Sequence, residues 1–136
     1  MEAQIRLGNI QVTHLSLQTK TFDTSVTAAD DLETTLNFGQ DYSDEDSKKF
    51  AILFEVIISN PSKDFEMSIK ITAHFESNVD IDDEFKKSSF AQISAPAIAF
   101  PFVRVFISNL TLNSGYSPII LPSFNFIKIV EDKQNN

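Results

Sequence analysis

The stretch APAIAFPFVRVFISNLTLNSGYSPIILPSFNF, residues 95–126, decides the fold, because its first half is apolar on nearly every side of a helical wheel. Its apolar positions recur at the spacing that stacks side chains along a helix. They form two series, Ala99–Val103–Phe106–Leu110 and Ile98–Phe102–Val105, interrupted by a narrow line of small or polar residues, Ala97, Pro101, Arg104, Ser108 and Thr111. A helix of this kind has to be covered on nearly every side.

The end of this helix is marked by a cluster of helix-breaking residues. Asn113, Ser114 and Gly115 favour a turn, so the helix is predicted to stop there. An extended segment is expected to follow, with Pro118 and Pro122 in it and Phe124 and Phe126 at its end.

Composition limits the class of protein. The 136 residues predict a single domain, residues 1–136, held together by packing, since the chain has 13 Phe and no Cys. The missing cysteines exclude thiolate metal sites and fit a cytoplasmic protein. A formal net charge of −8 argues against binding of duplex nucleic acid. No signal peptide is visible, and the apolar runs, broken at Glu55 and Arg104, predict no insertion into a membrane.

Four strands are predicted before the helix, at residues 4–18, 32–40, 50–59 and 65–75, in meander order. A change of phase near Thr13 and His14 predicts a bulge in the first strand. Residues 19–31 are expected to form a long crossover loop that carries Phe22 and Val26, and residues 41–49 an acidic hairpin loop. A short helix is expected within residues 78–92 and a frayed polar tail at residues 131–136.

The sequence therefore predicts an α+β fold, a four-stranded antiparallel sheet with one long helix packed on it. The fourth strand alternates regularly, whereas the third is apolar on both faces and looks buried from both sides. One helix covers one face of such a sheet and leaves its own far side exposed. Because exposed apolar patches of that size mark interfaces or binding grooves, we expect a homo-oligomer with helices sandwiched between the sheets of neighbouring subunits.

Catalytic and metal-binding patterns are weak. His14 and His74 lie on separate predicted strands, and the acidic cluster of residues 80–84 lacks the spacing of a calcium loop. With no glycine-rich phosphate loop and no hydrolase motif, neither enzymatic activity nor a cofactor is expected. Phe54, Phe75 and Phe106 are assigned to the core. Core and groove roles stay equally open for Phe22, Phe38, Phe100, Phe124 and Phe126.

The last third of the chain resembles the bacterial protein-export chaperone family SecB. The resemblance is carried, in this order, by Ala95-Pro96, Phe100-Pro101-Phe102-Val103-Arg104, Ile107-Ser108-Asn109, Gly115-Tyr116-Ser117-Pro118 and Leu121-Pro122-Ser123-Phe124-Asn125-Phe126. It implies a dimer of dimers that holds unfolded polypeptides in long apolar grooves without ATP.

The resemblance also implies roles for individual residues. An oligomer interface is expected on the fourth strand and the long helix, at Met67, Ile69, Ile71, Val103, Phe106 and Leu110. A client-binding groove is expected at Phe22, Val26, Leu36, Phe38, Phe100, Tyr116, Phe124 and Phe126. These side chains would contact client segments loosely, so that many sequences are accepted.

Two departures from the family pattern bear on the partners. The second long helix and acidic tail of the export member are missing, and the positions of its acidic contacts to the motor SecA fall on His14, Gln18 and Ser68. Binding to SecA therefore stays open beside a dedicated client such as an antitoxin. The alternatives from another class are an oligomeric domain that binds a small apolar ligand and a purely structural subunit.

Overall fold

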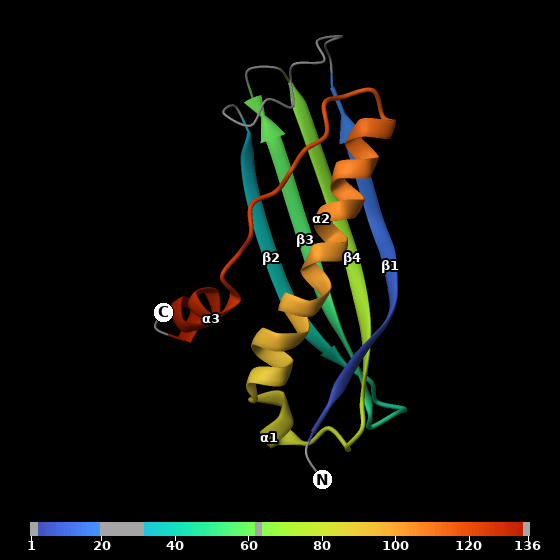
Figure 1. Cartoon of the computed structure of the whole chain (residues 1–136), viewed down its shortest axis with the longest axis vertical. Coiled ribbons are helices and arrows are strands. Elements are labelled where there is room, and N and C mark those ends of the chain that lie inside the picture. Colours follow the sequence, from blue (N-terminus) through green and yellow to red (C-terminus); the bar gives the residue numbers. More distant parts are fainter. Residues whose placement is uncertain (1–2, 20–31, 62–63, 135–136) are drawn as a thin grey trace.

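The structure, a computed structural model, describes residues 3–19, 32–61 and 64–134. Over these residues the chain forms four strands, three α-helices and one π-helical turn. The elements are β1 Ile5–Gln18, β2 Glu33–Tyr42, β3 Lys49–Asn60, β4 Phe65–Ser77, α1 Asp83–Lys86, η4 Phe90–Ser94, α2 Ala95–Asn113 and α3 Phe126–Gln134. The strands form one antiparallel sheet, α2 crosses one of its faces, and α3 lies beside β2 (Figure 1). The α+β prediction is confirmed.

The strand order corrects the predicted meander. The order is β1-β4-β3-β2, so β2, β3 and β4 follow one another while β1 lies beyond β4. Leu15 of β1, for example, is opposite Ile69 of β4. The 14 residues between Gln18 and Glu33 are long enough to connect the two edges of the sheet. The expected bulge in β1 is confirmed by a register shift between Val12 and His14.

The two faces of the sheet differ in how well they are covered. On the helix side, Ile52, Phe54 and Val56 of β3 are at most 2% exposed, and β4 alternates between buried and more exposed residues as predicted. On the other face Leu53 is 42% exposed. The expectation that β3 is buried from both sides is thus wrong for the single chain, because α2 covers one face only.

Helix α2 ends where the sequence predicts. Asn113 is its last residue, and Gly115 has a φ of +94°, a backbone conformation that glycine adopts without strain. Its sheet-facing side is buried, including Ala99, Val103 and Ile107. Pro96 stands in its first turn, where no N–H group is needed for the helical ladder.

The π-helical turn η4 explains a contact between β2 and the start of α2. In η4 the Ala95 N–H bonds to the carbonyl of Phe90, five residues earlier. The next bond of this kind would join Pro96 to Ala91, but proline has no N–H group. Gln40 of β2 supplies the missing donor, since its Nε2 lies 3.1 Å from the Ala91 carbonyl oxygen. The strand is thereby tied to the start of the long helix.

Helix α3 was missed by the sequence prediction of a frayed tail. It begins after Asn125, whose side-chain oxygen accepts a hydrogen bond from the Lys128 N–H at 3.1 Å. This is the capping contact that favours asparagine before a helix. The sequence signal was therefore present: a capping residue followed by apolar residues at helical spacing, Phe126, Ile129 and Val130.

Residues Phe90–Asn113 together form 24 helical residues, a stretch long and apolar enough to cross a membrane by length and composition. The sequence expectation that the apolar runs are too short therefore does not hold for this stretch, because Arg104 alone does not interrupt it. Core helices of soluble proteins meet the same criterion. Here α2 packs one side on the sheet, and Arg104 bonds to the chain that follows the helix.

Candidate functional site

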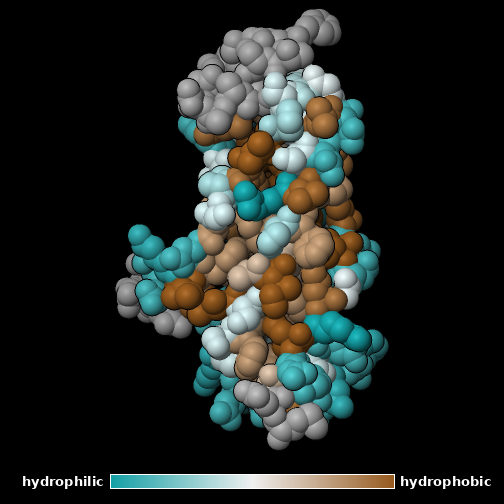
Figure 2. Space-filling view, in the orientation of Figure 1, coloured by the Kyte–Doolittle hydropathy of each residue, from teal (hydrophilic) through white to brown (hydrophobic). Residues whose placement is uncertain are grey.

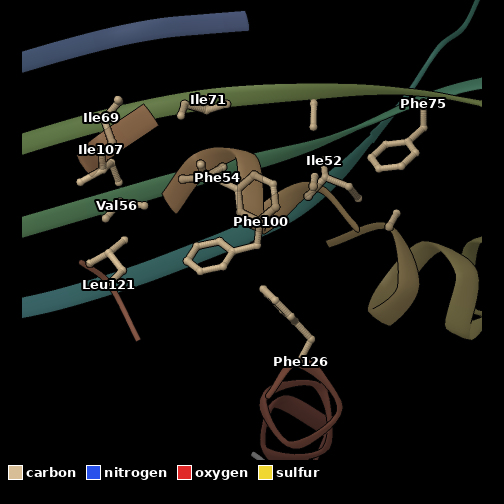
Figure 3. Packing of buried hydrophobic residues seen from close by; sticks show 14 of the residues in the cluster. Ile52, Phe54, Val56, Ile69, Ile71, Phe75, Phe100, Ile107, Leu121 and Phe126 are labelled. Atoms are coloured by element: carbon tan, nitrogen blue, oxygen red, sulfur yellow. The ribbon is translucent and has the colours of Figure 1, made fainter. Parts of the chain in front are cut away.

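Five phenylalanines from separate parts of the chain meet beside β2. We refer to Phe38, Phe54, Phe100, Phe124 and Phe126 as the aromatic cluster. Phe126 lies edge-on to Phe38 with ring centroids 5.2 Å apart and to Phe100 at 5.7 Å, and Phe100 lies edge-on to Phe124 at 5.1 Å. Figure 3 shows Phe126 projecting from α3 toward Phe100, near Phe54 of the sheet. Edge-to-face contacts of this kind are favourable beyond the area they bury.

The aromatic cluster contains half of the predicted client-binding residues. Phe38 and Phe124 are half-buried at its rim, whereas Phe100 and Phe126 are 3% and 5% exposed, each covered by the other rings. The groove predicted at these residues is therefore filled by the chain's own side chains. Of the other predicted residues, Leu36 packs on the core and Tyr116 lies edge-on to Phe65 at 5.3 Å. Phe22 and Val26 lie outside the described residues.

The segment between α2 and α3, residues 114–125, is held against the helix by polar side chains. Arg104 Nε donates to the Leu121 carbonyl at 3.0 Å, and Ser108 Oγ donates to the Ile119 carbonyl at 2.6 Å. Thr111 Oγ1 accepts from the Ile119 N–H at 2.9 Å. The last three residues of the polar line that the sequence places along the helix, Arg104, Ser108 and Thr111, thus lie on the side that this segment covers. Arg104 is half-buried, and Thr111 is completely buried.

Side chains of the segment alternate as in a strand. Ile119 and Leu121 are 2% exposed and join the core, while Ile120 between them is 76% exposed. Figure 2 shows apolar side chains gathered along the middle of this face of the molecule, over α2 and the segment. The segment therefore connects the helix to the aromatic cluster and adds exposed apolar surface of its own.

The outer side of α2 carries a second apolar surface, which we call the helix stripe: Ile98, Phe102, Val105 and Leu112, between 43% and 60% exposed. Their spacing places them on one side of the helix. Helix α2 contacts β1, where Val12 and Leu15 are also exposed and pair with Ile71 and Ile69 of the helix-side face. Cross-strand partners share a face of the sheet, so these two residues lie on the same side of the sheet as α2.

The predicted interface residues lie largely inside the subunit. Met67, Ile69, Ile71 and Val103 are at most 2% exposed in the single chain, and Phe106 and Leu110 are half-buried against the core. The reason is that the helix-facing residues of β4 are covered by α2 of their own chain. Four of the six side chains are therefore unavailable for direct contact with a second subunit in this arrangement. The exposed apolar residues of α2 are instead those of the helix stripe.

The open face of the sheet is polar and mixed in charge. Glu55 Oε2 lies 3.8 Å from Lys70 Nζ, and Asn37 Nδ2 donates to the other oxygen of Glu55 at 3.3 Å. A shallow hollow of about 300 Å³ lies over these residues. His14, Gln18 and Ser68 share this face, since they pair with Lys70, Glu66 and Ser16. The positive charge of Lys70 opposite His14 differs from the acidic contacts expected of an export subunit.

Two acidic residues of the cluster at residues 80–84 have structural partners. Asp82 Oδ1 accepts the Phe85 N–H at 2.8 Å and caps α1, and Asp80 accepts a hydrogen bond from Ser47 at 2.6 Å. Within residues 3–19, 32–61 and 64–134, no group of three or more His, Cys, Asp or Glu side chains converges to hold a metal ion.

Burial raises the pKa of Tyr42. Its ring stacks on the Phe50 ring with centroids 6.1 Å apart, and Lys86 Nζ lies 4.9 Å from the centre of the Tyr42 ring.

The arrangement of sheet, long helix and connecting segment defines a SecB-like subunit. The chain is similar in structure to the Mycobacterium tuberculosis Rv1957 SecB-like chaperone, determined in complex with a ChAD peptide from the Rv1956 HigA1 antitoxin, with a TM-score of 0.65, 19% identity and 90% of each chain covered. It is also similar to a protein of unknown function from Streptococcus agalactiae, with a TM-score of 0.53, 12% identity and 90% and 100% of the two chains covered.

Sequence comparison identifies the family. Residues 1–136 match the family SecB, described as preprotein translocase subunit SecB, and the chain belongs to that family. An uncharacterized protein, MJ0357 of Methanocaldococcus jannaschii, is 32% identical over 104 residues, which is 70% of this chain. The matched region spans 65% of the length of that relative.

Proposed function

We propose that the protein is an ATP-independent holding chaperone that binds non-native polypeptides through the aromatic cluster and the apolar surface around it. The observation that carries the proposal is the cluster itself: ring side chains from β2, α2, residues 114–125 and α3 meet at one place. Two of them, Phe38 and Phe124, are only half-buried at its rim.

Membership of the SecB family and the likeness to a SecB-like chaperone bound to an antitoxin peptide support a chaperone role. SecB-like chaperones are not an enzyme class, and we expect neither catalysis nor a cofactor. We propose an unfolded polypeptide as the client. It is either a protein on its way to export or a dedicated client such as an antitoxin. Binding to SecA is less favoured, because Lys70 lies opposite His14 on the face where acidic contacts are expected.

Apolar burial would supply the affinity. Removing apolar client surface from water contributes roughly 25 cal/mol per Å², from which the cost of ordering the client is subtracted. Aromatic side chains bury a large area while losing little conformational freedom, and they do not require a fixed client sequence. The net charge of −8 favours neutral or basic clients and keeps the loaded chaperone soluble.

We propose further that the protein assembles in the cytoplasm as a homotetramer, a dimer of dimers. The helix stripe and the exposed Val12 and Leu15 of β1 form apolar surface on one side of the sheet, and a second copy would remove it from water. Sedimentation velocity at micromolar concentration is expected to show a tetramer, and a monomer would contradict this part of the proposal.

The test of chaperone function is suppression of aggregation. A chemically denatured substrate protein is diluted into buffer with the chaperone, and light scattering is followed. Stoichiometric tetramer is expected to suppress the scattering, and Phe124→Ala is expected to weaken the suppression because it removes a rim ring of the cluster. Leu53→Ala, an exposed apolar residue on the other face of the sheet, is the matched control. Wild-type protein that suppresses aggregation of no substrate would overturn the proposal.

The rival function, binding of a small apolar ligand, gives a different result. Native mass spectrometry of the freshly purified protein would then show a co-purified small molecule. For the holding chaperone, we expect a peptide array to show broad binding of segments rich in aromatic residues.

A further inference from the structure

The open face of the sheet has a hollow where β1 departs from regular pairing. The register between β1 and β4 shifts after Leu7, so that Gly8 and Asn9 of β1 together lie opposite His74 of β4. Two residues opposite one is the pattern of a β-bulge, and bulges are over-represented next to active sites. Gly8 has no side chain, and Ala51, the β3 partner of His74, has only a methyl group. A hollow of about 330 Å³ is left beside His74, and we call it the bulge hollow.

Basic side chains from three strands line the bulge hollow: Arg6 of β1, Lys49 of β3 and His74 of β4. Arg6 and Lys49 are the cross-strand partners of Glu76 on its two sides, so all three share one face of the sheet. His74 is on the same face, because alternate residues of a strand point the same way, and its Nε2 lies 3.4 Å from Gln11 Oε1. Among the described residues that line the hollow, Glu76 carries the one carboxylate, so basic side chains outnumber acidic ones.

The present partners of Arg6 and Lys49 hold these side chains weakly. Arg6 Nη2 lies 3.5 Å from Glu76 Oε2, and the arginine side chain is 81% exposed. Lys49 Nζ lies 3.8 Å from Asp46 Oδ2, and the lysine side chain is 60% exposed. Exposed ion pairs contribute little to stability, because water and salt screen them. A carboxylate from another chain can therefore compete for both cations.

The spacing of the two cations favours a chain with several carboxylates over a single small anion. Strand β4 lies between β1 and β3, and neighbouring strands are about 4.8 Å apart, so the main chains at Arg6 and Lys49 are separated by about 10 Å. In an extended segment that rises about 3.3 Å per residue, carboxylates three residues apart are separated by about the same distance. One such segment can reach both cations, with His74 beside it.

We propose that the bulge hollow binds an acidic, extended segment of a partner polypeptide, whose carboxylates contact Arg6, Lys49 and His74. The inference does not rest on the proposed client binding, because the aromatic cluster is on the helix side of the sheet. The net charge of −8 opposes acidic chains elsewhere on the surface, so binding depends on these three side chains. The partner has the opposite charge to one that the acidic contacts of an export subunit would attract.

The first experiment measures binding of an acidic peptide to the full-length protein. The probe is a fluorescent ten-residue peptide with capped ends, in which glutamate alternates with serine, and fluorescence anisotropy gives its Kd. Arg6→Gln and Lys49→Gln are each expected to weaken binding about threefold, the effect of one exposed ion pair. Lys128→Gln removes the same charge from an exposed lysine of α3 and should leave the Kd unchanged. No binding to the wild type, or equal losses in all three variants, would overturn the proposal.

The second experiment reverses the direction of the effect. Glu76→Gln removes the carboxylate that competes for Arg6, so the acidic peptide is expected to bind about threefold more tightly. Glu66→Gln removes the same charge from an exposed residue at the other end of β4 and should not change the Kd. Unchanged or weaker binding by Glu76→Gln would show that the peptide does not use Arg6 and would overturn the site.

A competition experiment separates an acidic segment from a small oxyanion. At equal ionic strength, sodium phosphate is expected to displace the peptide no better than sodium chloride does, because both act by screening alone. Stronger displacement by phosphate would identify a small oxyanion as the ligand of the bulge hollow and overturn the assignment to a polypeptide segment.

Discussion

The hydroxyl of Thr111 links two main-chain groups that lie on different elements. Its oxygen accepts a hydrogen bond from the Ile119 N–H at 2.9 Å, and its O–H donates to the Ile107 carbonyl at 2.9 Å. The buried Thr111 side chain thus provides the hydrogen bond that a neighbouring strand would otherwise provide to the main chain of residue 119. The side of α2 that is least apolar in sequence becomes the side on which residues 114–125 are fixed.

Thr111→Val tests this link, because it keeps the shape of the side chain and removes the hydroxyl. The buried N–H of Ile119 would lose its partner, which costs about 1–3 kcal/mol of the free energy of unfolding. Urea unfolding followed by circular dichroism measures the loss. Thr35→Val, on the exposed face of β2, is the matched control. Equal stability of the two variants would show that Thr111 does not fix the segment.

Gln40→Met tests the contact between β2 and the π-helical turn. The variant leaves the Ala91 carbonyl without the donor that replaces the absent N–H of Pro96, and we expect a loss of about 1 kcal/mol in the free energy of unfolding. Gln18→Met on β1 serves as the control, since its side chain is exposed. If both variants lose the same free energy of unfolding, the effect comes from placing methionine in a strand and not from the contact with Ala91.

The sequence predicted those features that depend on local pattern. Alternation in β4, the bulge before His14 and the stop at Gly115 all come from residue spacing and backbone chemistry. It could not place β1 beside β4, because strand order depends on contacts between distant residues. From the sequence, Thr111 was assigned to the polar side of the long helix. Its role could not be predicted, because the partner of its hydroxyl, Ile119, lies in the segment after the helix.

In the candidate site, too, the sequence indicated which residues matter but not how distant parts of the chain contact one another. Phe38, Phe100, Phe124 and Phe126 were singled out as groove or core residues, and the structure brings all four together. Their mutual covering was not predictable, because it depends on α3. That helix was missed although Asn125 provides a capping signal, since the polar residues after it were taken as a frayed end.

High pH gives a prediction from Tyr42. Burial raises its pKa above the ordinary value of about 10, so the folded state keeps the phenolic proton to higher pH than the unfolded state does. Stability is therefore unaffected below pH 10 and falls as the pH rises above about 10, where the unfolded chain loses its proton first. Urea unfolding at pH 8 and pH 11 measures this, and Tyr42→Phe is expected to lose less stability between these two pH values than the wild type.

Ile69→Ala separates a core role from an interface role for β4. Ile69 is completely buried beneath α2 in the single chain, so its truncation should lower the free energy of unfolding by about 2–5 kcal/mol. Because the cavity would lie inside the subunit, the change should be the same at low and high protein concentration. A stability loss that grows with dilution would instead place Ile69 in contact with a second subunit.

Phe102→Glu tests the helix stripe as the assembly surface. Phe102 is 55% exposed, so a glutamate is tolerated in the isolated subunit, but it would place an unpaired charge within an apolar interface. We therefore expect the variant to sediment as a smaller species than the wild type, with an unchanged circular dichroism spectrum. Ile120→Glu introduces the same charge at a residue that is 76% exposed and lies off the stripe, and it should leave the assembly intact. If Phe102→Glu sediments like the wild type and Ile120→Glu does not, the interface lies on the segment after α2 and the helix stripe has another role.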